Sequence, residues 1–265
     1  MKKIKTALIS VSDKKNLNLL LKSLSKHKIQ IISSGGTFKE IKKLGYKCLE
    51  ISKYTGSQEI LGGRVKTLHP KIHAGILSVR KNKSHIKDLK KNNFEEIDLV
   101  IVNFYPFEKT LENKNKHNKI IENIDVGGPA MVRAAAKNYS DVAVITNPEQ
   151  YEELMEELNL NKSRTTLEFR QKMSEIAFTE TAYYDGLISN YFNSQSKNLF
   201  PKKKIFFGNL IEKLRYGENP HQEASIYSIN KQLNINQLHG KQLSYNNYND
   251  IFAALLISKS LPKNT

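Results

Sequence analysis

The sequence has very little cysteine, no tryptophan and no long apolar run. Cys48 is the single cysteine among 265 residues, which excludes an intrachain disulfide and favours a cytoplasmic location. No apolar run approaches the roughly 18 residues that a membrane span needs. The polar segment at residues 12–15 also comes too early for the apolar centre of a secretion signal. We therefore expect a folded chain without a membrane partner.

Acidic residues are scarce compared with basic ones. The 42 lysines and arginines exceed the 26 aspartates and glutamates, giving a net charge of +16, which suggests nucleic acid as a partner. Surfaces that read bases favour arginine, however, whereas lysine dominates here. We interpret the charge as a solvated, lysine-rich surface, expect no nucleic-acid partner, and expect small anionic molecules to be attracted.

The order of apolar segments predicts an α/β fold. Short apolar runs predict strands at residues 6–11, 29–32, 99–102 and 142–145. Helical spacing is found at residues 17–24, 37–45, 128–136, 151–158 and 165–192. Ser12 and Asp13 are expected to cap the first of these helices, and Thr37 with Glu40 the second. Alternating strands and helices predict a three-layer fold, with a mostly parallel sheet covered on both faces.

The last part of the chain shows no completed pattern. A polar linker is predicted at residues 194–198. Fewer residues follow it than the roughly 100 of a typical domain. We therefore divide the chain into a first domain at residues 1–195 and, at residues 196–265, a linker with an incomplete second α/β domain.

Two glycine pairs stand just before predicted helices. The first is Ser34-Gly35-Gly36-Thr37, and the second, in Asp125-Val126-Gly127-Gly128, has a carboxylate at its start. Backbone N–H groups at a helix N-terminus favour phosphate, and glycine lets the backbone approach it. Two such loops would meet at the carboxyl ends of the strands. A tight turn without a ligand is the alternative for each.

The segment at residues 62–70 concentrates two cations, a hydroxyl and an imidazole between two glycines and a proline. A binding loop and a basic surface loop are both consistent with it. His69 and His73 have the spacing of zinc ligands on a helix, but Pro70 lies between them and neither carboxylate nor cysteine completes a set. We expect no metal site.

Two further residues, Tyr105 and Lys137, have side chains that can take part in catalysis, and each also has a structural interpretation. Tyr105 follows the strand that begins at Leu99 and would emerge at its carboxyl end, either in a site or as a rim aromatic. Lys137 ends the alanine-rich helix, where a cation would also complement the helix dipole. No serine elbow, Walker loop or dinucleotide fingerprint is present, so chemistry must come from Lys, Tyr, Asp and backbone amides.

Taken together, these motifs closely resemble one family, the AICAR transformylase/IMP cyclohydrolases (AICAR, 5-aminoimidazole-4-carboxamide ribonucleotide; IMP, inosine monophosphate). The segments that resemble the cyclohydrolase half are residues 10–14, 34–37, 62–70, 73–77, 103–107, 125–128 and 133–138. Residues 214–222 and 240–247 resemble the opening of the transformylase half. The resemblance implies a complete methylglyoxal synthase-like domain followed by an incomplete transformylase. The family's catalytic lysine-histidine pair lies further downstream, so formyl transfer is not expected.

The resemblance implies closure of formyl-AICAR to IMP with loss of water, the last step of de novo purine biosynthesis. This cyclic-amidine hydrolase chemistry needs proton removal from a weakly nucleophilic carboxamide nitrogen and stabilisation of charge on the formyl oxygen. The matching catalytic positions are Lys66, Tyr105, Asp125 and Lys137. The matching substrate-binding positions are Ser10, Ser12, Lys14, Ser34, Gly35, Gly36, Thr37, Arg64, Thr67, Asn103, Gly127 and Gly128.

For the cyclohydrolase half the resemblance implies no metal or organic cofactor, and a homodimer is consistent with the family. The transformylase half would use 10-formyltetrahydrofolate as co-substrate, with Arg215 and Tyr216 as AICAR contacts. Two alternatives are a methylglyoxal synthase-type phosphate lyase and a regulatory module that binds a phosphorylated metabolite. The lyase would share the glycine loop but has no need of residues 66–70 or 105–107.

Overall fold

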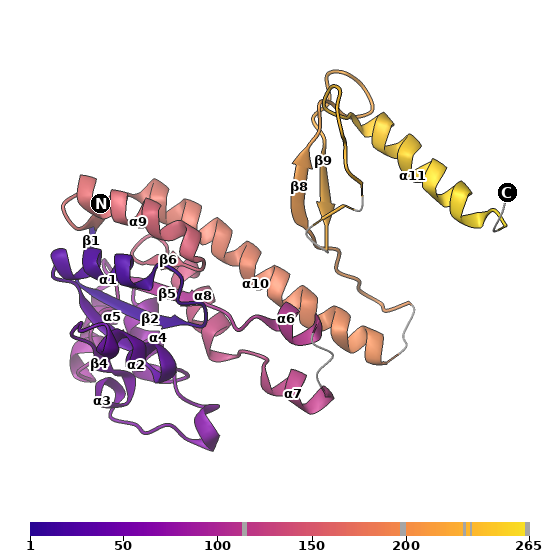
Figure 1. Ribbon diagram of the computed structural model, residues 1–265. Helices are drawn as coiled ribbons and strands as arrows, with labels where there is room; N and C mark the ends of the chain where they lie inside the picture. The colour runs from indigo at the N-terminus through magenta and orange to yellow at the C-terminus, as the bar shows by residue number, and fades with distance from the viewer. Residues whose placement is uncertain (113–115, 197–199, 230–231, 234, 263–265) are drawn as a thin grey trace. The chain divides into compact units, whose positions relative to one another are not determined.

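The computed structural model describes residues 1–112, 116–196, 200–229, 232–233 and 235–262 (Figure 1). The chain divides into two compact units, Met1–Ile188 and Ser189–Thr265. The long helix α10 (Leu167–Gln195) crosses this division. The domain boundary after residue 195 stays a prediction.

The first unit is built on a parallel sheet of five strands in the order β4-β3-β2-β5-β6. These strands are β2 (Thr6–Val11), β3 (Gln30–Ser33), β4 (Leu49–Glu50), β5 (Leu99–Asn103) and β6 (Ala143–Ile145). Most side chains of the four strands β2, β3, β5 and β6 are buried, as expected of a parallel sheet covered on both faces, whereas both residues of β4 are half-buried. The predicted α/β class is confirmed. The short edge strand β4 was missed because it holds too few residues to give a pattern.

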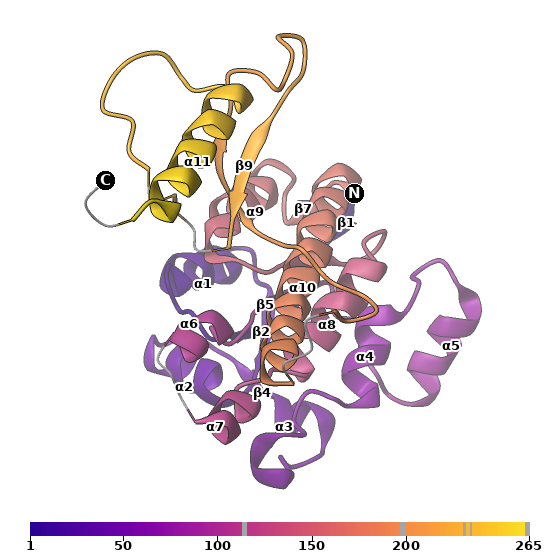
Figure 2. The same cartoon turned by 90° about the vertical axis from the view of Figure 1, so that its right-hand side faces the viewer.

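Helices lie on both sides of the sheet (Figures 1 and 2). They are α1 (Leu17–Lys26), α2 (Gly35–Lys43), α3 (Ile51–Thr55), α4 (Pro70–Leu77), α5 (Lys83–Lys91), α6 (Phe107–Glu112), α7 (His117–Glu122), α8 (Gly127–Lys137), α9 (Tyr151–Leu160) and α10. Parallel crossovers are right-handed, so the strand order places α1 and α2 on one face and α8 on the other. Helix α10 packs on the α8 side, where Ser174 Oγ donates to the Ala136 carbonyl at 2.9 Å. No helix among the described residues is long and apolar enough to cross a membrane.

Three helix starts differ from the sequence predictions. Helix α1 begins after Asn16, which has a left-handed backbone (φ 59°), so Ser12 and Asp13 do not cap it. Helix α2 begins at Gly35, two residues before the predicted cap Thr37. The unpredicted helix α4 begins at Pro70, where the missing N–H costs nothing because it lies in the first turn.

The second unit contains the antiparallel strands β8 (Asn209–Lys213) and β9 (Ser225–Ser228) and the helix α11 (Tyr245–Ser260). The two family-like segments of this unit pair through their backbones. Arg215 N donates to Leu243 O at 3.0 Å, and Tyr245 N to Tyr216 O at 3.1 Å. The predicted second α/β region is therefore present.

Candidate active site

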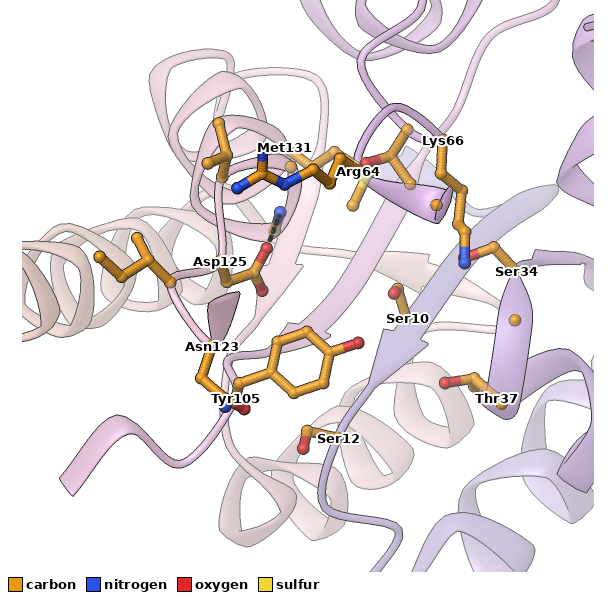
Figure 3. A pocket seen from close by; sticks show the side chains of 18 of the residues that line it. Ser10, Ser12, Ser34, Thr37, Arg64, Lys66, Tyr105, Asn123, Asp125 and Met131 are labelled. Atoms are coloured by element: carbon orange, nitrogen blue, oxygen red, sulfur yellow. Dashed lines mark hydrogen bonds between the residues drawn. The ribbon is translucent and has the colours of Figure 1, made fainter. Parts of the chain in front are cut away.

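A cleft of about 930 Å³ lies at the carboxyl ends of β2, β3 and β5, facing the first turns of α2 and α8 (Figure 3). The chain runs outward from β2 to β3 and β4 on one side of the sheet, and outward from the neighbouring β5 to β6 on the other. Open α/β sheets bind ligands at such a reversal of strand order. Every catalytic and substrate-binding position predicted for the first domain lines this cleft, with the exception of Lys137.

The first glycine pair opens toward the cleft. Gly35 has a left-handed backbone (φ +52°), and a Cβ built on Gly36 would meet no atom within 4 Å. Ser34 makes no side-chain cap bond to α2. The first N–H groups of a helix lack partners within it. This helix start is therefore available to an anion in the cleft.

Thr37 and Asn103 line the cleft, and their side chains form hydrogen bonds with the protein backbone. Thr37 Oγ1 accepts from Val11 N at 3.0 Å and donates to Val11 O at 2.9 Å. Asn103 Oδ1 accepts from the N–H groups of Ser12 (2.6 Å) and Asp13 (2.9 Å), while its Nδ2 donates to Asp13 O at 3.0 Å. These bonds fix the end of β2 and the loop that follows it, and the predicted substrate contacts of Thr37 and Asn103 stay predictions.

The two cations of the 62–70 segment are held by acidic residues that the sequence gave no reason to select. Lys66 Nζ lies 2.9 Å from Glu59 Oε1, and Arg64 Nη2 lies 2.9 Å from Glu122 Oε1. Lys66 Nζ also lies only 2.9 Å from where a Cβ on Gly35 would stand, which places it beside the first glycine pair. Exposed ion pairs are worth about 1 kcal/mol or less, so an anionic ligand can compete for both cations.

The second glycine pair is closed by its own carboxylate. Asp125 Oδ1 accepts from Gly128 N at 2.9 Å, and a Cβ on Gly128 would lie 2.3 Å from Asp125 Oδ2. A Cβ on Gly127 would lie 2.2 Å from Thr67 Oγ1. Burial raises the pKa of Asp125, and the Gly128 N–H bond offsets this in part. Only glycine fits here, and the result is a carboxylate held at the start of α8.

Tyr105 crosses the cleft opening. Its side chain is 55% exposed, and its ring points into the space between Asp125 and Ser10 (Figure 3). The prediction that Tyr105 emerges at the carboxyl end of its strand is confirmed, because it follows β5 and lines the cleft.

Lys137 is not brought into this cleft. It is exposed and stands ten residues after Gly127 at the far end of α8, a separation of about 15 Å at 1.5 Å per residue. Lys137 therefore does not stand beside the other three predicted catalytic residues in this structure, and its catalytic role stays a prediction. The resemblance grouped all four through the motif, which carries no information on distance along a helix.

His69 has a structural role at the start of α4. His69 precedes α4, where its Nδ1 accepts from Lys71 N at 3.1 Å and its Nε2 contacts Ser57 Oγ at 3.2 Å. Within the described residues, no group of three metal-ligating side chains comes together.

In the second unit, the Arg215 guanidinium lies 4.8 Å from the centre of the Tyr216 ring and donates to its hydroxyl at 3.1 Å. Their predicted role as AICAR contacts stays a prediction.

Comparison with known proteins places this geometry in a family. Residues 135–265 match the family described as AICARFT/IMPCHase bienzyme, and residues 16–130 match the MGS-like domain. The bifunctional purine biosynthesis protein PurH of Bradyrhizobium diazoefficiens is 47% identical over 96% of this chain and 48% of that protein. PurH of Acetivibrio thermocellus is 45% identical over 99% of this chain and 52% of that protein.

The chain belongs to the AICARFT/IMPCHase bienzyme family. It spans about half the length of these curated PurH relatives and corresponds to their amino-terminal half. A solved structure described as "Crystal structure of ForH" is also similar, with a TM-score of 0.63 and 29% identity over 71% of this chain and 99% of that one. The family resemblance and the MGS-like fold expected from the sequence are both confirmed.

Proposed function

We propose that residues 1–188 close the ring of formyl-AICAR to give IMP and water. The observation that carries this proposal is the convergence of Lys66, Tyr105 and Asp125 in one cleft with an open glycine loop. A cation, a phenol and a half-buried carboxylate are the groups that this reaction needs, and the loop suits the substrate's phosphate.

The carboxamide nitrogen of the substrate attacks its formyl carbon and forms a C–N bond. As the bond from that carbon to the formyl oxygen breaks, the formamido nitrogen loses its proton and forms a C=N bond to the same carbon. The oxygen leaves as water, which carries away one proton from each nitrogen. Because both groups belong to one molecule, the cleft mainly has to hold them in the reactive orientation. It must also accept a proton from nitrogen and stabilise the charge that develops on oxygen.

The geometry supports separate roles for the three residues. Asp125 accepts the carboxamide proton, because burial raises its pKa and brings it closer to that of a useful base. Lys66 stabilises and protonates the departing oxygen once the substrate displaces it from Glu59. Tyr105 orients the carboxamide from the cleft opening. The first turn of α2 and Arg64 bind the phosphate.

Purified protein should convert formyl-AICAR to IMP without added metal or folate. Chromatography of the reaction mixture measures the IMP that forms. Lys66→Met should lower kcat by about 10²-fold, in the range typical for loss of a proton donor or oxyanion contact. The exposed Lys53→Met is the matched control and should keep wild-type rates. Absence of IMP formation, or an equal loss in both variants, would refute the proposal.

The phosphate lyase alternative predicts a different product from the same cleft. Incubation with dihydroxyacetone phosphate should release no methylglyoxal if the cyclohydrolase assignment is right. The regulatory-module alternative predicts binding of IMP with no turnover of formyl-AICAR.

Family membership also supports proposals for the second unit. We propose that Arg215 and Tyr216 contribute to an AICAR site at which 10-formyltetrahydrofolate donates the formyl group in the bifunctional protein. Family membership likewise supports a homodimer and a cytoplasmic location. Sedimentation of the purified protein tests the homodimer.

A further inference from the structure

Tyr184 of α10 joins the two loops that carry the proposed reactive groups. Its side chain is only 4% exposed and does not itself line the cleft. Its hydroxyl accepts from the backbone N–H of Asp125 at 2.8 Å and lies 3.4 Å from the carbonyl of Asn123, to which it donates. One buried hydroxyl thus satisfies two backbone groups of the loop that leads into α8.

The ring of Tyr184 holds the other loop. Its centre lies 5.0 Å from that of Phe104 in a tilted arrangement and 6.0 Å from that of Phe107 in an edge-to-face one. These two phenylalanines flank Tyr105 in the sequence. Aromatic pairs at such distances and angles are favourable beyond the area they bury. Tyr184 therefore contacts both the backbone that carries Asp125 and the phenylalanines on either side of Tyr105.

The hydroxyl can serve in this way only while it stays neutral. Burial raises the pKa of Tyr184 to about 12, so the proton that the hydroxyl donates to the Asn123 carbonyl stays in place throughout the working pH range. A phenol can donate one hydrogen bond and accept others at the same time. Phenylalanine at this position would keep the ring contacts and lose only the two backbone contacts.

We propose that Tyr184 is a positioning residue for ring closure, which sets the Asp125 carboxylate against the part of the substrate that Tyr105 orients. This inference rests on the proposed function. Tyr184 touches no substrate, so its effect should fall on kcat more than on KM. Displacement of a reacting group by about 1 Å can lower a rate by on the order of 10²-fold.

The test compares Tyr184→Phe with Tyr183→Phe. Tyr183 is the preceding residue on α10, and its hydroxyl bonds to Glu108 rather than to the 123–125 loop. Both variants lose one hydroxyl and keep the ring. We expect Tyr184→Phe to lower kcat at least tenfold with KM within about twofold and to move the acidic limb of the kcat–pH profile, which reports the catalytic base. Tyr183→Phe should stay within about twofold of wild type in kcat, as for hydroxyl losses remote from the reacting atoms.

Hydrogen exchange provides a readout that needs no turnover. The Asp125 amide should exchange at least about tenfold faster in Tyr184→Phe, because it loses its acceptor, and at the wild-type rate in Tyr183→Phe. An unchanged Asp125 amide, or faster exchange without any loss of kcat, would overturn the positioning role. If the wild-type protein makes no IMP, the proposed function fails, and the exchange rates then decide alone whether Tyr184 holds the loop.

Discussion

The two glycine pairs of the first unit look alike in sequence and do opposite things in the structure. Both pairs open a helix, α2 or α8, and both line the same cleft. A Cβ on Gly36 would stand in open space, whereas a Cβ on Gly128 would collide with Asp125. The first pair leaves a helix start free for a ligand, and the second fills its helix start with the chain's own carboxylate.

This difference divides the work of the cleft. Under the proposed function, the free N-terminus of α2 would bind the substrate's phosphate and so govern KM. The occupied N-terminus of α8 holds a carboxylate at a fixed place, where burial raises its pKa, and under the same proposal it would govern the chemical step. A change in the first loop should therefore appear in KM, and a change in the second in kcat.

The largest effect is expected from Asp125→Asn. The amide has nearly the same shape and its oxygen can still accept from Gly128 N, but it cannot take a proton from the carboxamide. Loss of a general base typically costs about 10²–10⁴-fold, and we expect kcat to fall within that range with KM little changed. Single-turnover mixing measures the step directly. Retention of more than a tenth of the wild-type rate would remove Asp125 from the proton transfer.

The next largest effect is expected from Gly128→Ala. The added methyl group would stand 2.3 Å from Asp125 Oδ2, so the carboxylate must move. We expect a loss of kcat of about 10–100-fold and a loss of roughly 1–3 kcal/mol in the free energy of unfolding. Kinetics and urea denaturation measure the two effects. A variant with normal kcat would show that the second loop does not need to hold the Asp125 carboxylate at this position for catalysis.

Motifs located the cleft from the sequence, but packing details decided what each residue does there. The strands at residues 6–11 and 99–102 were predictable because their burial leaves continuous apolar runs. The commitment of Asn103 to the backbone of the 12–13 loop was not predictable, since it depends on the register that places Val11 opposite Asn103. The proposed role of Tyr184 could not be predicted from the sequence. The apolar spacing of a long helix indicates which side of it is buried, but not which backbone group one hydroxyl contacts.

A smaller and opposite pair of effects is expected from Gly36→Ala. Gly36 has no positive φ and an added Cβ meets nothing, so the substitution should stabilise the fold by about 0.4–1 kcal/mol. It should also raise KM for formyl-AICAR roughly tenfold, because the methyl group displaces the phosphate from the backbone N–H groups. Gly45→Ala, remote from the cleft just after α2, is the control for KM and should leave it unchanged. The left-handed backbone of Gly45 (φ +85°) means that this alanine should destabilise the fold, so it is no control for stability. An unchanged KM in Gly36→Ala would show that the first loop does not contact phosphate.

The smallest expected effect is a pH dependence of the free energy of unfolding that comes from Asp125 in the second loop. Burial raises the pKa of Asp125 in the folded protein above its ordinary value of 3.8, so ionisation favours the unfolded chain. Below pH 3.8 both states are protonated, and wild type and Asp125→Asn should differ in stability by a constant amount. As the pH rises toward the folded-state pKa, wild type should lose stability relative to Asp125→Asn, and the difference should then level off. Urea denaturation from pH 3 to 7 measures it, with the exposed Asp88→Asn as the matched control. If wild type instead gained stability relative to Asp125→Asn as the pH rises, hydrogen bonding to the carboxylate would outweigh its burial, and the second loop would stabilise the charge that we expect it to disfavour.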